Sequence, residues 1–168
     1  YCYDRFTDDV DYPSRTRRLL ELFERYDRKP TLLLDLACGT GSIAEEMAKI
    51  GYDVIGVDYS DEMLGIALDK KFESGLNIQY LCQDMRKLDL YGSMDVTVCA
   101  LDSINHLGSL RDVKKVFLEQ YCQLLDSLGG SNLMTDTEEK CLEEILNDEN
   151  MIHKVNNFIE IWDKRFKF

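Results

Sequence analysis

Short apolar runs alternate with longer amphipathic segments along most of the chain. The apolar runs predict strands at 32–36, 52–58, 77–84 and 94–103. Apolar positions with helical spacing predict helices at 14–28, 42–50, 60–74 and 111–130. Alternation of this kind is typical of an α/β protein with a parallel sheet. We therefore expect a Rossmann-like, doubly wound, mostly parallel sheet with helices on both faces.

The pattern weakens toward the end of the sequence. A short fifth strand, a helix and a hairpin are predicted at 131–136, 137–148 and 151–166. We expect residues 1–136 to form a ligand-binding core, with residues 1–12 as an N-terminal lid. Residues 137–168 would then form a helix and a hairpin that serve as a substrate lid or an insertion.

Charge and composition narrow the range of partners. The 168 residues carry a formal net charge of −12, and such a field repels phosphate backbones, so no nucleic-acid partner is expected. The apolar runs are well short of the roughly 20 residues that a membrane span requires. The six cysteines form no C-x-x-C pair or zinc-like cluster, so a metal site is not expected. Reduced thiols in a cytoplasmic protein are the simplest interpretation.

Acids and glycines gather where the predicted strands end. In a parallel sheet the carboxyl ends of the strands share one edge, where ligands bind at the point of reversed strand order. We therefore expect these residues to converge on one crevice. They are Asp35, Gly39, Gly41, Asp58, Asp84 and Asp102.

Two ligand classes fit this edge. The stretch "GTGSIA" is a permitted variant of the dinucleotide fingerprint, which would make the chain an NAD-dependent oxidoreductase. Asp58 could accept from both hydroxyls of a ribose, or it could cap the helix at 60–74. Asp35 would repel a pyrophosphate but suits a cationic group. S-adenosyl-L-methionine, with its ribose, ammonium, carboxylate and cationic sulfur, fits this combination.

Several stretches resemble the class I S-adenosylmethionine-dependent methyltransferases. They are "LLLDLACGTG", "VIGVDYSDEML" and "LCQDMRKL", and the opening "YDRFTDDVDY" and the later "CALDSINHL" are similar to a bacterial small-molecule group of that family. The resemblance implies that Asp35, Ala37, Gly39 and Gly41 line the methionine end of the cofactor. It also implies that Asp58 holds the ribose hydroxyls.

The same resemblance implies contacts around the adenine. Tyr59 and Met63 would lie beside the ring, although core packing also explains Met63. Asp84 would accept from the adenine amino group, and Met85 would pack on the ring.

Further implied contacts lie toward the substrate. Ala100, Leu101 and Asp102 would lie near the cofactor and the substrate entrance. Tyr3 and Tyr12 would fold over the cofactor as part of the lid, or they would only anchor the N-terminal segment.

The implied reaction is in-line transfer of a methyl group to a small-molecule acceptor. A sulfonium methyl is already activated, so a general base is needed only where the acceptor must lose a proton. No catalytic residue is assigned, and Asp102 and His106 are the candidates for a base. Cys38 has no adjacent activating base and is expected to pack beneath the loop. A non-catalytic cofactor-binding or interaction protein of the same fold is the other alternative.

The sequence departs from the family near its end. The turn after the long helix has the sequence "LDSLGG" instead of the family's leucine-lysine-proline-glycine-glycine, and the fifth strand is short and polar. The family continues beyond this point, so we expect a sheet that is incomplete at the C-terminus. Either further residues follow Phe168, or a homodimer covers the exposed edge.

Overall fold

The computed structural model describes residues 10–25, 29–92, 94–100, 103–109, 111–117 and 120. The expectations for residues 131–168, and those for Tyr3, Leu101 and Asp102, lie outside this part of the chain. Within it, no helix is long and apolar enough to cross a membrane.

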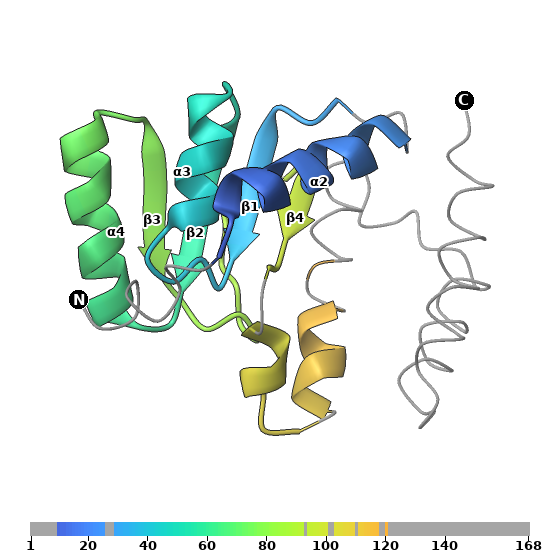
Figure 1. Ribbon diagram of the computed structural model, residues 1–168. Coiled ribbons are helices and arrows are strands. Elements are labelled where there is room, and N and C mark those ends of the chain that lie inside the picture. Colours follow the sequence, from blue (N-terminus) through green and yellow to red (C-terminus); the bar gives the residue numbers. More distant parts are fainter. Residues whose placement is uncertain are drawn as a thin grey trace.

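The centre of the fold is a parallel sheet. Its strands are β1 (Leu32–Leu36), β2 (Asp53–Asp58), β3 (Ile78–Cys82) and β4 (Val96–Val98). They lie in the order β3-β2-β1-β4, and every neighbouring pair is parallel (Figure 1). The chain moves outward from β1 to β3 and then returns to the other side of β1. The strand order therefore reverses between β1 and β4, which confirms the predicted Rossmann-like architecture.

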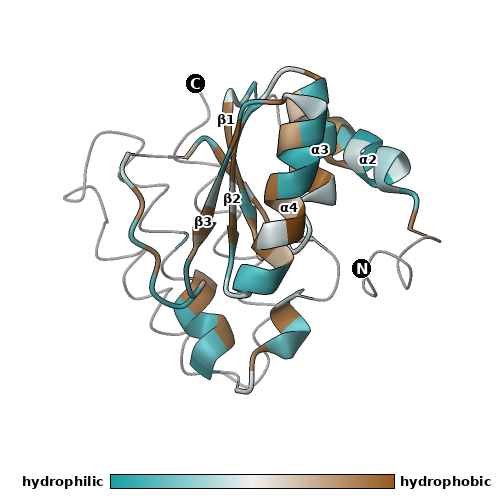
Figure 2. Ribbon diagram, turned by 90° about the vertical axis from the view of Figure 1, so that its left-hand side faces the viewer, coloured by the Kyte–Doolittle hydropathy of each residue, from teal (hydrophilic) through white to brown (hydrophobic). Residues whose placement is uncertain are grey.

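Three helices cover one face of this sheet (Figure 2). They are α2 (Tyr12–Arg25), α3 (Ser42–Lys49) and α4 (Asp61–Ser74). Helix α4 begins where the sequence predicts, because the Ser60 hydroxyl accepts from the Met63 N–H at 3.2 Å. Helix α2 begins two residues earlier than predicted. The Asp11 carboxylate accepts from the Ser14 N–H at 3.0 Å and so caps the helix there.

Alternate residues of β1 supply two cores on opposite faces of the sheet. Leu33 packs with α3 and with apolar residues of α2 on the helical face. Leu34 and Leu36 pack on the other face, together with Val116 of the helical segment 111–117. Asp35 has the same parity as Leu33, so its side chain projects toward α3. A buried carboxylate at that position requires a specific partner or a function.

Gly56 in β2 lies where no larger residue has room. A Cβ on Gly56 would lie 2.6 Å from two ring carbons of Tyr80 and 3.0 Å from the Cys38 sulfur. Gly56→Ala is therefore expected to lower the free energy of unfolding by about 1–3 kcal/mol, through overpacking. Urea denaturation measures the change. Gly65 lies within α4 with nothing near its Cβ position, so Gly65→Ala should instead stabilise the chain by roughly 0.5–1 kcal/mol. Equal effects of the two substitutions would contradict this account.

Candidate functional site

A pocket opens at the point where the strand order reverses. The pocket is partly open to solvent, and its empty space of about 370 Å³ includes some of that solvent. The loop after β1 forms one wall, and residues that follow β4 form another, as expected of a ligand site in an open α/β sheet. The lining residues are Tyr12, Asp35, Ala37, Cys38, Gly39, Thr40, Ser42, Ile43, Ala100 and Ser103.

The loop between β1 and α3 turns sharply through left-handed conformations. Ala37, Gly39 and Gly41 have φ angles of 58°, 56° and 75°. Such angles suit glycine, whereas an alanine pays a steric cost, so Ala37 is held in place by its surroundings. The Cys38 N–H donates to the Val57 carbonyl at 3.0 Å, which ties the loop to the end of β2. The loop is thereby fixed beside the pocket with its backbone accessible to a ligand.

Asp35 is the most unusual group in the pocket. It is 1% exposed, and its carboxylate accepts from the backbone N–H of Ala44. Its Oδ2 atom has no hydrogen-bond partner among the described residues. Burial, with a smaller contribution from the charge of Asp58, raises the pKa of Asp35 to about 7. A cationic ligand group would supply the missing partner and favour the ionised form.

Asp58 lies at the end of β2, beside the loop. Its Oδ2 accepts from the Gly39 N–H at 2.8 Å, and its Oδ1 accepts from the Ser60 N–H at 2.9 Å. Both predicted roles therefore stay open. The carboxylate supports the start of α4, yet each oxygen has a second lone pair that a ligand hydroxyl could use. Asp58 does not line the pocket itself.

Asp84 is already paired in the structure. Its two oxygens accept from Nε and Nη2 of Arg86 at 2.6–3.1 Å, which lowers the pKa of Asp84 to about 2. Asp84 lies outside the pocket lining, and any contact with an adenine would have to share the carboxylate with Arg86. Tyr59 is 77% exposed, whereas Met63 and Met85 are half-buried. These four residues surround the ends of β2 and β3 but are not brought into the pocket.

The remaining predicted residues are divided between the pocket and the surface. Tyr12 and Ala100 both line the pocket. Tyr12 is the first residue of α2, so the helix begins at the last residue of the predicted lid segment. His106 ends the short helix η1 (Ser103–His106), is exposed, and is not among the lining residues.

Hydroxyl groups are the part of the pocket that the sequence prediction missed. Thr40 and Ser42 line it from the glycine loop, and Ser103 lines it from η1. The Ser103 hydroxyl donates to the Ala100 carbonyl at 3.0 Å. The signal was present in "GTGS", where small hydroxyl residues alternate with glycines. Cys38 also lines the pocket, and burial together with Asp35 raises the pKa of its thiol, which keeps it protonated.

The comparison with known protein families decides the assignment. The family model described as "Methyltransferase domain" matches residues 33–129, more than half of the chain. The chain belongs to the methyltransferase-domain family. The match covers the strands apart from Leu32, the glycine loop, and every pocket-lining residue except Tyr12. It confirms the resemblance to class I S-adenosylmethionine-dependent methyltransferases, and it favours that hypothesis over the NAD-dependent alternative.

Individual relatives agree with the family model. A putative methyltransferase, YqeM of Bacillus subtilis, is 43% identical over 116 residues, which are 68% of this chain and 45% of that protein. Glycine/sarcosine N-methyltransferase of Halorhodospira halochloris is 32% identical over 125 residues, 72% of this chain and 47% of that protein. This chain therefore spans about half the length of the curated relatives it matches.

A solved structure shows the same fold. The S-adenosylmethionine-dependent methyltransferase of Clostridium acetobutylicum superposes with a TM-score of 0.64 at 30% identity. The superposition covers 76% of this chain and 53% of that protein. S-adenosyl-L-methionine is thus the cofactor that membership of this methyltransferase family implies.

Proposed function

We propose that this chain binds S-adenosyl-L-methionine in the pocket between the ends of β1 and β4 and transfers its methyl group to a small-molecule acceptor. The observation that carries the proposal is the buried Asp35 carboxylate, with one oxygen that has no partner among the described residues. A buried charge of this kind is costly unless a ligand completes its contacts. The ammonium at the amino-acid end of the cofactor is a suitable partner.

The rest of the pocket fits the same cofactor. Gly39 lines the pocket and adds no side chain that would keep a ligand from the backbone, whereas Gly41 is not among the lining residues and a Cβ there would meet Tyr80 instead. The amino end of α3 and the Ser42 hydroxyl offer donors for a carboxylate. A dinucleotide would instead bring a pyrophosphate toward Asp35, where the two negative charges would repel each other.

Two further contacts extend the proposal along the cofactor. Asp58 would accept from the ribose hydroxyls while it keeps the Gly39 and Ser60 amides. Met63 and Met85 are half-buried, and Met85 already packs against the core that contains Leu34; the exposed part of each side chain would be suited to pack against a flat apolar ring such as adenine.

The chemistry needs little from the protein beyond binding and alignment. When bound, the cofactor supplies a methyl group that its cationic sulfur has already activated. The chain orients the cofactor through Asp35, the glycine loop and Asp58, and the apolar side of Ile43 helps to keep water from the pocket. The Cys38 thiol is held protonated, so we assign it packing and not nucleophilic attack.

The acceptor is proposed only at the level of its class. The related enzyme of Halorhodospira halochloris is named for two small amines, glycine and sarcosine, and others are named for ubiquinone biosynthesis. These names favour a small acceptor over a protein or a nucleic acid for this chain as well. The acidic charge of this chain also disfavours a polyanionic acceptor.

A turnover assay tests the proposal. The chain would be incubated with methyl-labelled S-adenosylmethionine and a panel of small amines, phenols and carboxylic acids, and S-adenosylhomocysteine would be quantified. Formation of S-adenosylhomocysteine that depends on one acceptor class is the expected result. Tight cofactor binding without turnover on any class would instead indicate a non-catalytic cofactor-binding protein.

A further inference from the structure

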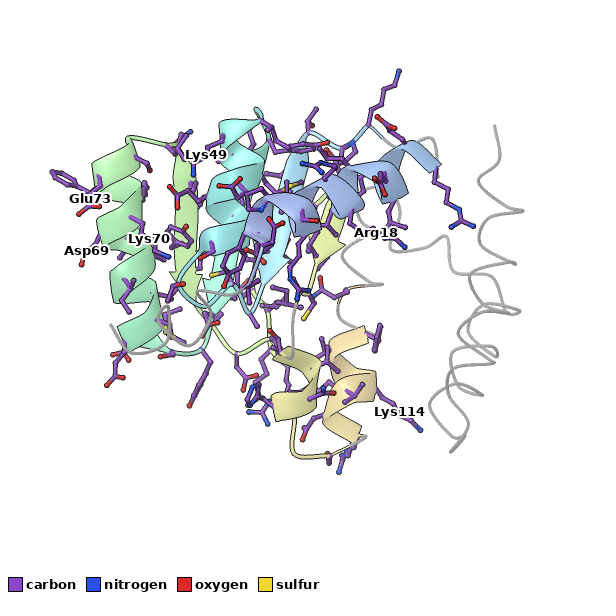
Figure 3. The ribbon with its side chains drawn as sticks, viewed as in Figure 1. Arg18, Lys49, Asp69, Lys70, Glu73 and Lys114 are labelled. Atoms are coloured by element: carbon purple, nitrogen blue, oxygen red, sulfur yellow. The ribbon has the colours of Figure 1, made fainter. Side chains whose placement is uncertain are left out.

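Lys70 reaches from α4 to the glycine loop. Its Nζ donates to the Thr40 hydroxyl at 3.3 Å and to the Ser42 hydroxyl at 3.2 Å, so it bridges segments about 30 residues apart. Figure 3 shows Lys70 on the side of α4 that faces α3, whereas Asp69 and Glu73 lie on the outer side. Lys70 is half-buried, and the other two are exposed. A lysine is thus directed at the loop that forms the pocket wall.

The ammonium fixes the direction in which the two hydroxyls can donate. An ammonium has donors only, so both hydroxyl oxygens must accept from it. Their own protons then turn away from Lys70. The two oxygens lie 3.5 Å apart, so one of the two hydroxyls can donate a hydrogen bond to the other. Because Ser42 lines the pocket, its hydroxyl can donate to a group bound there.

Two neighbouring features show which kind of group this end of the pocket would take. Helix α3 begins after Gly41, which has no side chain to cap it, and within its first turn the Asp35 carboxylate accepts from the Ala44 N–H and offsets part of the positive end of the dipole. The carboxylate of Asp35 lines the same pocket, with its Oδ2 lacking a partner in the described part of the chain. The pocket therefore combines a group that attracts an ammonium with donors that attract a carboxylate.

We propose that Lys70 is a positioning residue for the carboxylate at the amino-acid end of the cofactor. It acts through the hydroxyls of Thr40 and Ser42, by orienting them as donors and by placing a positive charge behind them. This inference rests on the proposed function, because it concerns how the same pocket holds S-adenosylmethionine. It assigns the recognition of one ligand group to a residue outside the pocket lining.

A purely structural lysine would behave differently. If Lys70 only tied α4 to the loop, its removal would weaken every ligand of the pocket by a similar factor. If it acts on the carboxylate, the loss must depend on whether the ligand has one. Decarboxylated S-adenosylmethionine keeps the nucleoside, the sulfonium and the ammonium, so it isolates this difference.

The experiment compares the two ligands by calorimetric titration of the full chain. Lys70→Met is expected to weaken S-adenosylmethionine by about tenfold and to change the affinity for the decarboxylated ligand by less than about twofold. Lys71→Met removes the same charge from the next position of α4 and should leave both affinities unchanged. Lys70→Arg, which keeps a cationic donor, should restore most of the affinity for S-adenosylmethionine.

The outcomes separate this inference from the proposed function. Equal losses for both ligands, or no loss for either, would overturn the role of Lys70 while leaving the cofactor assignment intact. A wild-type chain that binds neither ligand would overturn the proposed function, and this inference with it. Should Lys70→Met fail to fold, Lys70→Gln removes the charge and keeps a polar side chain of similar reach. A loss of affinity confined to the carboxylated ligand in Lys70→Gln supports the role, and equal or absent losses for the two ligands refute it.

Discussion

Asparagine in place of Asp35 is expected to stabilise the folded chain near neutral pH and, at the same time, to weaken cofactor binding. The substitution keeps the size and an acceptor oxygen for the Ala44 N–H but removes the buried charge. Its two effects have opposite signs because the carboxylate is costly in the empty pocket and useful in the filled one.

The stability effect follows from the raised pKa. An unfolded chain releases the Asp35 proton near its ordinary pKa of 3.8, whereas the folded chain keeps it until about pH 7. The folded state binds more protons in this window, so the free energy of unfolding falls as the pH rises through it. The total fall is about 4 kcal/mol. Asp35→Asn lacks this contribution and should be more stable than wild type above pH 7.

Urea denaturation at a series of pH values measures this effect. Asp53 is exposed at the start of β2, so Asp53→Asn makes the same chemical change without the burial. It should follow the wild-type pH dependence, whereas Asp35→Asn should be flatter between pH 4 and 7. A wild-type chain whose stability does not fall over this range would contradict the assignment of a costly buried carboxylate.

The binding effect should appear in the same variant. Loss of a charge-assisted contact with the ligand ammonium is expected to weaken S-adenosylmethionine by about tenfold to a hundredfold. In wild type, affinity should increase from about pH 5 to 7 as Asp35 ionises, and this increase should be absent from Asp35→Asn. Calorimetry at several pH values tests both points. Unchanged affinity in a folded Asp35→Asn chain would remove Asp35 from the site.

The second large effect is expected from Asp58→Ala. We expect it to weaken S-adenosylhomocysteine by about 1–3 kcal/mol, because charge-assisted bonds to the ribose hydroxyls are lost. The same substitution releases the Gly39 and Ser60 amides, so the chain should also be less stable. A simple affinity loss would therefore not distinguish ribose recognition from distortion of the loop.

A double cycle makes that distinction. The 2′-deoxy analogue of S-adenosylhomocysteine lacks one hydroxyl, and wild type should bind it more weakly than the parent ligand. In Asp58→Ala the two ligands should bind with equal affinity, because the carboxylate that accepts from the 2′-hydroxyl has been removed. Asp61→Ala, at an exposed position three residues away, serves as the control and should keep the wild-type preference. A preference that persists in Asp58→Ala would refute the ribose role.

The sequence predicted the central strands well because burial on both faces leaves little choice of residue. Strand β1 has the predicted bounds, Leu32–Leu36. Strand β4 is shorter than predicted, at Val96–Val98. The preceding Asp95 accepts instead from the Thr31 and Leu32 amides at 2.8 and 2.9 Å. A side chain that caps a distant backbone segment does not alter the pattern of apolar and polar positions, so the end of the strand could not be predicted from that pattern.

In the site, too, the residues placed by strand order could be predicted, whereas the contacts between side chains of separate elements could not. The convergence of Asp35 and Gly39 followed from strand order alone, since the carboxyl ends of parallel strands share one edge. Lys70 was not predicted, because a lysine on an amphipathic helix has no local feature that shows which loop it reaches. Asp84 was expected to bind a ligand, but its strong pair with Arg86, two residues away, could not be inferred from strand ends.

The most direct test of the central claim is a calorimetric titration of the wild-type chain with S-adenosylmethionine, S-adenosylhomocysteine and NAD under identical conditions. We expect micromolar binding of the first two ligands and no binding of NAD, because Asp35 requires a cationic partner and repels a pyrophosphate. Binding of NAD without binding of either adenosyl ligand would contradict the proposed role of the pocket.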